Sequence, residues 1–336
     1  MLTFDSFTLI PAYSEIESRS SGVDISSLLV DGNGKVLTNL YIPVINANMH
    51  SICTEELVDK LLVEGAAASY HRFFRTQEER NQTLLRVLKN RRNREELSRF
   101  YPSIGVQKED YEFVDWLVDQ GTKNVIVDVN HGHHKLVGDI LKYIRDTHPK
   151  LTIMAGNVSS TDGIKYLRDR GAHIIKIGNS FGSVCSTRFA TGVGVHCLHV
   201  AKTYRDDTND WDTLLCLDGS IEHASDIAKC MIWGNMVMVG KMFAACDESY
   251  GRTVMVDNQK FKDYWGNASI VAKQVVSKED NHVRHIEGVS KLIPASGPIQ
   301  KTLDGIIDGI QSSFSFMGAR NLTEFQMTAP KQILEY

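Results

Sequence analysis

The feature that most constrains the fold is an alternation, repeated eight times, of short apolar runs with longer segments of helical periodicity. Short β-branched runs indicate buried strands, and apolar residues at helical spacing indicate amphipathic helices. Strands that alternate with helices form parallel sheets. The predicted strands are 42–47, 66–71, 102–107, 124–130, 152–158, 173–180, 214–220 and 236–243. The predicted helices are roughly 54–65, 76–92, 109–120, 134–148, 160–171, 194–205 and 222–234.

Eight β/α units predict an α/β fold, a (β/α)8 TIM barrel that takes residues 1–336 as a single domain. A chain of 336 residues with 42% hydrophobic content can bury a core of that size. Thr54 and Ser160 stand where helix N-caps are expected. A doubly wound open sheet is the alternative that the same alternation allows.

Polar and glycine residues gather directly after the predicted strands. TIM-barrel enzymes place their active sites at the C-terminal ends of the strands, although ordinary turns also use such residues. These positions therefore support an active site at one end of the barrel. They are Asn46 and Asn48, His71 and Arg72, Asp128 and Asn130, Gly156 and Asn157, 178–185, 218–220, and Gly240 and Lys241.

The pattern changes after the eighth predicted strand. Residues 247–298 are polar and weakly periodic, which predicts a long loop without regular secondary structure that acts as a flap over the barrel mouth. Residues 299–336 form a C-terminal helix and tail, with helical periodicity over 299–311. We expect that helix to dock on the barrel.

Composition excludes several classes of protein. The net charge of −4 indicates no nucleic-acid partner, and no apolar run reaches the roughly 20 residues that a membrane span requires. The first residues lack the pattern of a signal peptide, so we expect a soluble cytoplasmic protein. The six cysteines form no CxxC pair and are expected to be reduced. Five of them are expected to be structural, namely Cys53, Cys197, Cys216, Cys230 and Cys246.

The segment 176–194 after the sixth predicted strand carries the most chemical information. Gly182 and Ser183 suit a loop whose backbone amides approach a phosphate. Cys185 follows closely, and Arg188 offers a positive charge that favours a thiolate. Spacing alone leaves two interpretations of Cys185 open, a covalent nucleophile or a buried structural thiol.

This loop closely resembles the cysteine loop of the GMP reductases, a branch of the inosine monophosphate dehydrogenase superfamily. The resemblance covers nearly the whole chain, and the continuation Thr187-Arg188 to 191–194 is similar to the reductase branch. The matching segments, in family order, are 4–24, 42–49, 127–129, 154–158, 176–178, 182–185, 187–188, 191–194, 218–219, Gly240, 242–243, Arg284, 287–288 and 316–319.

The resemblance implies that the chain converts GMP to IMP and ammonia with NADPH. Cys185 would attack purine C2 and form a covalent thioimidate, and Thr187 and Glu287 would transfer protons around the leaving ammonia. Asp128 would lie on the nicotinamide side. Arg72 stands where the family has a lysine implicated in its proton relay.

The resemblance also assigns binding residues, a cation and an assembly. NADPH would meet a pair of residues from a neighbouring subunit, which implies a homotetramer. The superfamily's loop carbonyls hold a monovalent cation, so potassium is implied. The substrate residues are Ser183, Asp218, Gly219, Ser220, Gly240, Lys241, Gly266, Asn267, Ala268, Arg284 and Gly288. The cofactor residues are Ser18, Arg19, Arg72, Asp128, Val129, Asn130, Asn179 and Ser180. The potassium residues are Ser180, Gly182, Cys185 and Arg188.

The chain departs from the family pattern around the pocket. Three hypotheses follow: a divergent GMP reductase, a related purine-nucleotide oxidoreductase that acts on dGMP or runs as an IMP dehydrogenase, and a non-catalytic nucleotide-binding relative. A further cluster, His131, His133 and His134, is interpreted as a solvated turn and not a zinc site. The departures are Asn179 for an apolar residue, Ser180-Phe181 for Gly-Pro, Arg72 for lysine, His50 for aspartate, Ser220 and Lys241 for glycines, and Asn267-Ala268 for Met-Ser.

Overall fold

The computed structural model describes residues 1–89, 94–270, 272 and 287–336. Eight parallel strands form one sheet in the order β4-β11-β10-β9-β8-β7-β6-β5. A parallel bridge between Ile45 and Ala67 joins the two edge strands, so the sheet closes into a barrel. The predicted (β/α)8 barrel is confirmed, and the open doubly wound sheet is wrong. The barrel strands are β4 Val44–Asn46, β5 Ala68–Tyr70, β6 Phe100–Ile104, β7 Asn124–Asp128, β8 Thr152–Val158, β9 Ile174–Ile177, β10 Leu214–Asp218 and β11 Met236–Val239.

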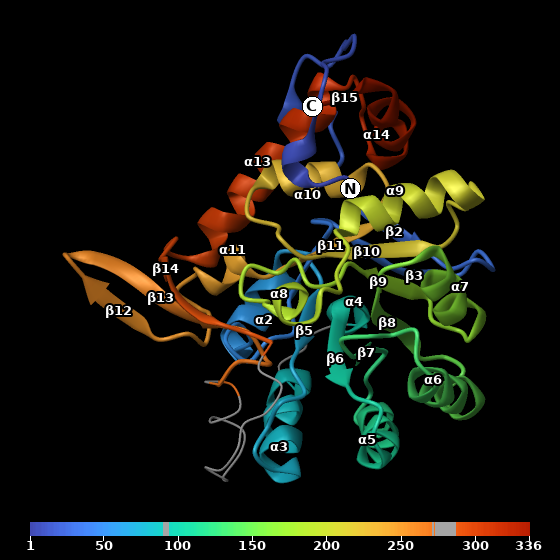
Figure 1. Cartoon of the computed structure of the whole chain (residues 1–336), viewed down its shortest axis with the longest axis vertical. Coiled ribbons are helices and arrows are strands. Elements are labelled where there is room, and N and C mark those ends of the chain that lie inside the picture. Colours follow the sequence, from blue (N-terminus) through green and yellow to red (C-terminus); the bar gives the residue numbers. More distant parts are fainter. Residues whose placement is uncertain (90–93, 271, 273–286) are drawn as a thin grey trace.

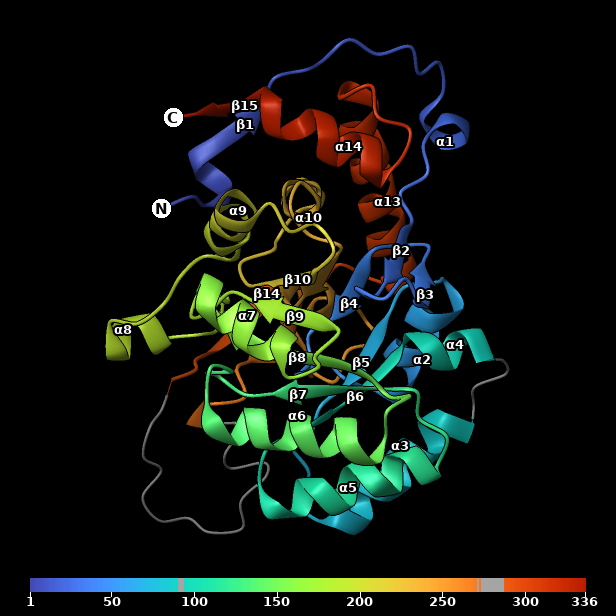
Figure 2. The ribbon, with the colours of Figure 1, turned by 90° about the vertical axis from the view of Figure 1, so that its right-hand side faces the viewer.

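Helices surround the barrel and follow its strands in the predicted alternation (Figure 2). Two predicted N-caps are confirmed: Thr54 Oγ1 accepts the Leu57 N–H at 3.0 Å, and Ser160 Oγ accepts the Gly163 N–H at 3.1 Å. The helices that match predictions are α2 Glu55–Val63, α3 Gln77–Lys89, α5 Lys108–Asp119, α6 Lys135–Thr147, α7 Thr161–Asp169, α9 Cys197–Thr208 and α10 Ala224–Met231. A short helix that was not predicted, α4 Arg94–Arg99, precedes β6.

Several strands are shorter than the sequence predicts, because their polar ends belong to loops. The run 173–180 is a strand only to Ile177. Gly178 and Ser180 have φ of +108° and +68°, which a strand does not accommodate. The chain therefore turns at the barrel mouth directly after β9.

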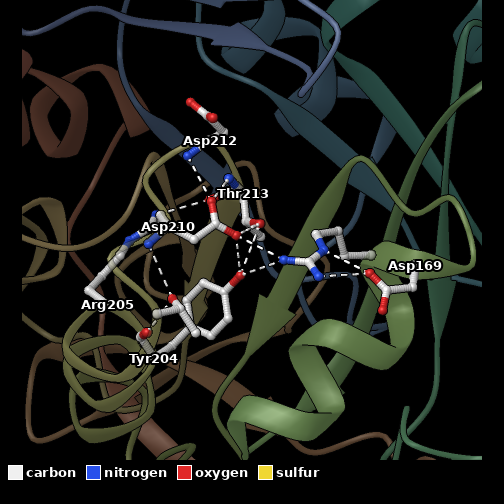
Figure 3. A network of polar contacts seen from close by, with 8 residues as sticks. Asp169, Tyr204, Arg205, Asp210, Asp212 and Thr213 are labelled. Carbon is white, nitrogen blue, oxygen red and sulfur yellow. Dashed lines mark hydrogen bonds and ion pairs between the residues drawn. The ribbon is translucent and has the colours of Figure 1, made fainter.

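A network of polar contacts ties α7, α9 and the start of β10 together (Figure 3). The Asp210 carboxylate accepts hydrogen bonds from the hydroxyls of Thr213 and Tyr204, each at 2.5 Å, and from Arg168 Nη1 at 3.0 Å. Burial opposes ionisation of this carboxyl, but these donors outweigh burial and hold its pKa well below the ordinary value. Arg205 donates to the carbonyls of Thr213 and Asp210.

The segment after β11 corrects one expectation. It was predicted to lack regular secondary structure, but β12 Thr253–Val256, β13 Gln259–Trp265 and β14 Ser290–Pro294 form an antiparallel sheet that extends from the barrel (Figure 1). Asp257 and Asn258 form a two-residue turn with φ of +48° and +62°, and such turns connect tight hairpins. Exposed residues on both faces of β12 weaken the alternation by which a strand is recognised.

The two ends of the chain meet beside the barrel (Figure 1). Strand β1 Phe7–Leu9 pairs antiparallel with β15 Ile333–Glu335. Helix α13 Ile299–Phe316 is longer than the predicted 299–311 and packs against α10. The remaining elements are η1 Phe4–Ser6, α1 Arg19–Gly22, the hairpin β2 Ser27–Val30 and β3 Val36–Leu40, α8 Thr187–Thr191, α11 Lys241–Ala244, α14 Leu322–Thr328 and η2 Ala329–Gln332. Across the described part of the chain, no helix is both long and apolar enough to pass through a membrane.

Candidate active site

A pocket opens at the C-terminal ends of the barrel strands, where the polar strand ends predicted it. The space between its walls, mouth included, is about 1100 Å³. Asp128 and Asp218 are the last residues of β7 and β10, and both line it. Because the carboxyl ends of parallel strands meet at one face of a barrel, residues far apart in sequence converge here.

Cys185 begins a line of hydrogen bonds along one wall. Its Sγ donates to Thr187 Oγ1 at 3.3 Å, and that hydroxyl donates to Glu287 Oε2 at 2.8 Å. The thiol is partly exposed, whereas the other five cysteines are buried, as expected for structural thiols. A thiol, a hydroxyl and a carboxylate in this order form a path by which a proton can leave sulfur.

Backbone pairing between two distant segments builds this line. Cys185 forms an antiparallel bridge with Gly288. The Ser186 N–H donates to the Glu287 carbonyl at 2.8 Å, and the Val289 N–H donates to the Val184 carbonyl at 3.0 Å. The segment before β14 therefore pairs with the loop after β9 as a short antiparallel ladder. This pairing places Glu287 opposite Thr187.

A row of charged side chains, centred on the buried Lys176, lies along the pocket. Lys176, in β9, donates from Nζ to Asp128 Oδ1 at 2.7 Å, and its side chain is only 3% exposed. Arg72 Nε lies 3.8 Å from Asp128 Oδ2. Asp218 Oδ2 accepts from Asn157 Nδ2 at 2.8 Å.

The row has a distinct charge pattern. Burial opposes ionisation of Asp128, but Lys176 and Arg72 outweigh it and hold the carboxyl's pKa below its ordinary value. Burial likewise opposes the Lys176 ammonium, yet Asp128 and Asp218 raise its pKa. At Asp218 burial dominates and raises the pKa, against the pull of Lys176.

The loops after β10 and β11 also line the pocket. Gly219 and Ser220 have φ of +113° and +60°, so this turn runs through left-handed backbone conformations. A Cβ at Gly240 would lie 2.9 Å from the Tyr264 hydroxyl, which explains a glycine there. In a TIM barrel, the loops after the last two strands are a frequent phosphate site.

Hydrogen bonds hold residues 265–267, at the end of β13, to the loop after β4. Asn267 Oδ1 accepts the His50 N–H at 3.2 Å, and Asn267 Nδ2 donates to the Asn48 carbonyl at 3.3 Å. Ser51 Oγ donates to the Trp265 carbonyl at 2.7 Å. The loop after β4 and the end of β13 therefore act as one wall.

One departure in the cysteine loop, Phe181, packs against a histidine and an arginine. Phe181 lines the pocket and meets His196 edge to face, with ring centroids 5.3 Å apart. The Arg188 guanidinium lies 4.5 Å from the Phe181 ring centroid and equally far from that of Phe189. Arg188 thus stacks on rings and does not line the pocket beside Cys185, which was not foreseen.

Most of the predicted residues meet in this pocket. Arg72 contacts it through Asp128, whereas Ser18 and Arg19 lie outside it, and Arg284 falls outside the described residues. Arg19 donates to Ser312 Oγ on α13 at 2.7 Å. The predicted residues that line the pocket are Asp128, Val129, Asn130, Asn179, Ser180, Gly182, Ser183, Cys185, Thr187, Asp218, Gly219, Ser220, Gly240, Lys241, Gly266, Asn267, Ala268, Glu287 and Gly288.

The lining residues that were not assigned to the site from sequence include Lys176, Asn157, Glu222 and Tyr264. A charge inside the apolar run of β9 was the available signal for Lys176, since buried lysines require partners. Asn157 was visible as a polar strand end. Nothing local marks Glu222 or Tyr264.

The histidine cluster has local contacts. His134 caps α6 by accepting the Leu136 N–H on Nδ1 at 3.2 Å, and the His133 ring lies 4.7 Å from that of Tyr166.

Comparison with known proteins gives one consistent result. Residues 1–333 match the family described as IMP dehydrogenase / GMP reductase domain. A GMP reductase of Lactobacillus delbrueckii subsp. bulgaricus is 32% identical over 322 residues, which cover 95% of this chain and 91% of that protein. A GMP reductase of Streptococcus agalactiae serotype III is 32% identical over 95% of this chain and 91% of its own length. A GMP reductase of Lactobacillus johnsonii is 30% identical over 96% and 92%.

Proposed function

The chain belongs to the IMP dehydrogenase / GMP reductase family, and from that premise we propose that it reduces GMP to IMP and ammonia with NADPH. The observation that carries the proposal is the line from the Cys185 thiol through Thr187 to Glu287, within one pocket at the barrel mouth. Relatives named GMP reductase align over nearly their whole length.

The first step is a substitution at purine C2. Cys185 Sγ forms a bond to C2, and its proton passes through Thr187 to Glu287, the direction in which the two hydrogen bonds already point. Glu287 returns a proton to the 2-amino group, which leaves as ammonia. The product is a thioimidate on Cys185, and the carboxylate is ready to act again.

The second step replaces sulfur at C2 by hydrogen. NADPH, when bound, supplies a hydride to C2. The C–S bond then breaks with its electron pair going to sulfur, IMP leaves, and the Cys185 thiolate regains a proton that Glu287 takes up from solvent and passes back through Thr187.

The proposed substrate residues fall into three groups, which bind the ribose, the phosphate and the base. Asp218, fixed by Asn157, accepts hydrogen bonds from the ribose hydroxyls. The phosphate lies at the end formed after β10 and β11, and the base lies beside the cysteine. The proposed phosphate residues are Ser183, Gly219, Ser220, Gly240 and Lys241; the proposed base residues are Gly266, Asn267, Ala268, Arg284 and Gly288.

The β7 side of the pocket fits a polar cofactor. Arg72 Nε is buried, has no hydrogen-bond partner and lies beside Asp128, so a ligand there would satisfy it. An arginine holds its charge and does not shuttle protons, so Arg72 acts as a fixed cation. The proposed cofactor residues are Arg72, Asp128, Val129, Asn130, Asn179 and Ser180, with Ser18 and Arg19 from a neighbouring subunit of a homotetramer.

The cysteine loop offers a potassium ion backbone carbonyl oxygens. The Gly182 carbonyl accepts the Cys185 N–H at 2.9 Å, which leaves its second lone pair for a cation. Ser180, Gly182, Cys185 and Arg188 remain the proposed potassium residues, and we derive no step through the ion. A cytoplasmic location is part of the proposal and agrees with six unpaired cysteines.

The test is a substrate panel with the purified protein. We expect NADPH absorbance to fall when GMP is added. Turnover of dGMP, or of IMP with NAD, in the absence of GMP turnover would replace the proposal with a related oxidoreductase. Nucleotide binding without turnover of any purine would make the chain a binding protein.

A further inference from the structure

The charged side chains that line the pocket present a problem for an anionic substrate. Among the lining residues that the structure describes, acidic groups outnumber basic ones, so a phosphate would meet a surplus of carboxylates there. Any cation that is able to reach the phosphate therefore decides how tightly it binds. The charged lining residues are Asp128, Lys176, Asp218, Glu222, Lys241 and Glu287.

Lys176 already forms a buried ion pair and is not free to bind a phosphate. Its Nζ is 2.7 Å from Asp128 Oδ1, its side chain is 3% exposed, and Asp218 adds a second carboxylate nearby. Among the lining residues that the structure describes, Lys241 is the other cation.

Lys241 has a partner too, but of a different kind. Its Nζ lies 2.5 Å from Glu222 Oε2, and the two side chains are 36% and 35% exposed. Glu222 follows β10 and Lys241 begins α11 after β11, so the pair spans the two loops of the proposed phosphate end. Exposed ion pairs contribute little to stability, so this pair can open without disturbing the fold.

We propose that Lys241 exchanges Glu222 for the phosphate of the bound nucleotide, and that Glu222 is the competing charge that limits phosphate affinity. The inference rests on the proposed function for the position of the phosphate. A phosphate dianion carries more charge than a carboxylate and offers three acceptor oxygens. The Lys241 ammonium therefore binds the phosphate in preference to Glu222. A nucleoside has no such group and leaves the pair intact.

The experiment measures the dissociation constants of GMP and guanosine by calorimetry for the wild type, Lys241→Met and Glu222→Gln. We expect Lys241→Met to weaken GMP about tenfold or more, the loss expected for a charge-assisted hydrogen bond, with guanosine unchanged. Glu222→Gln should tighten GMP about three- to tenfold, again with guanosine unchanged. Unchanged guanosine binding also shows that each variant is folded.

A matched pair elsewhere on the barrel supplies the control. Lys202 and Asp206 on α9 also lie 2.5 Å apart and are exposed, but neither lines the pocket. Lys202→Met and Asp206→Asn make the same charge changes and should leave the ratio of GMP to guanosine affinity unaltered. A ratio that moves equally in both pairs would overturn the inference in favour of a general charge effect.

Two other results would also overturn it. Weaker GMP binding by Glu222→Gln would show that Glu222 supports the site and does not compete in it. GMP affinity that is unaltered in both pocket variants would place the phosphate elsewhere. If the wild type binds GMP with the expected variant pattern but does not oxidise NADPH, the proposed reaction fails and the exchange stands.

Discussion

Replacing Lys176 by methionine should lower the stability of the barrel far more than an ordinary loss of an ion pair. Methionine keeps most of the side-chain length but leaves the Asp128 carboxylate without its 2.7 Å partner. The Asp128 side chain is 16% exposed, so water replaces little of what is lost. Arg72, 3.8 Å away, remains as partial compensation.

The size of the effect follows from burial. Removing one partner of a buried pair costs about 3–5 kcal/mol, and we expect the lower end because Arg72 remains. At about 2.1 cal/mol/K per residue, the 336-residue chain has an unfolding entropy near 0.7 kcal/mol/K. The loss therefore corresponds to a fall in Tm of about 4 °C.

Thermal unfolding followed by circular dichroism measures this difference. Lys202→Met is the control, because it breaks an ion pair between the same atom types at 2.5 Å on the surface. That change should cost less than about 1 kcal/mol, or about 1 °C. Equal Tm values for the Lys176→Met and Lys202→Met proteins would refute the reasoning, since burial is the property that separates them.

Two further predictions concern the proton path from Cys185 to Glu287 and the polar network around Asp210. Thr187→Val and Glu287→Gln should each lower kcat by about 10²–10⁴ with little change in GMP affinity, as measured by NADPH oxidation and calorimetry; a loss confined to KM would assign these residues to binding. Asp210→Asn should cost about 1.5–3 kcal/mol at pH 7 in urea unfolding, because hydrogen bonds to a charged group are lost. The folded pKa of Asp210 lies below the unfolded value of about 3.9, so its contribution is complete above that pH and disappears as the pH falls through the folded pKa. The variant's stability should therefore fall less steeply than that of the wild type in this acid range, and parallel acid profiles would contradict the assignment.

The barrel was predictable from sequence because its strands are buried on both faces. Val125, Ile126 and Val127 of β7 are all fully buried, so the strand is a continuous apolar run. The hairpin of β12 and β13 was missed because β12 stands in solvent and shows no alternation. Its one local signal was Asp257-Asn258 at the turn.

The candidate site was likewise predictable from sequence only in part. Asp128 and Asp218 could be placed because strand ends converge wherever parallel strands close. The Lys241–Glu222 pair depends on how two separate loops approach each other, and residue spacing carries no information on that. Arg188 was expected to offer a positive charge to Cys185, but its guanidinium stacks on Phe181 and Phe189.

The central claim is that Cys185 forms the covalent bond to the nucleotide, and the rate of NADPH oxidation with GMP by the Cys185→Ala protein tests it most directly. Cys246→Ala is the control, because it removes a buried thiol outside the pocket. We predict that Cys185→Ala still binds GMP but has no measurable turnover, whereas Cys246→Ala stays near the wild-type rate. Turnover by Cys185→Ala within a few-fold of the wild-type rate would contradict the claim.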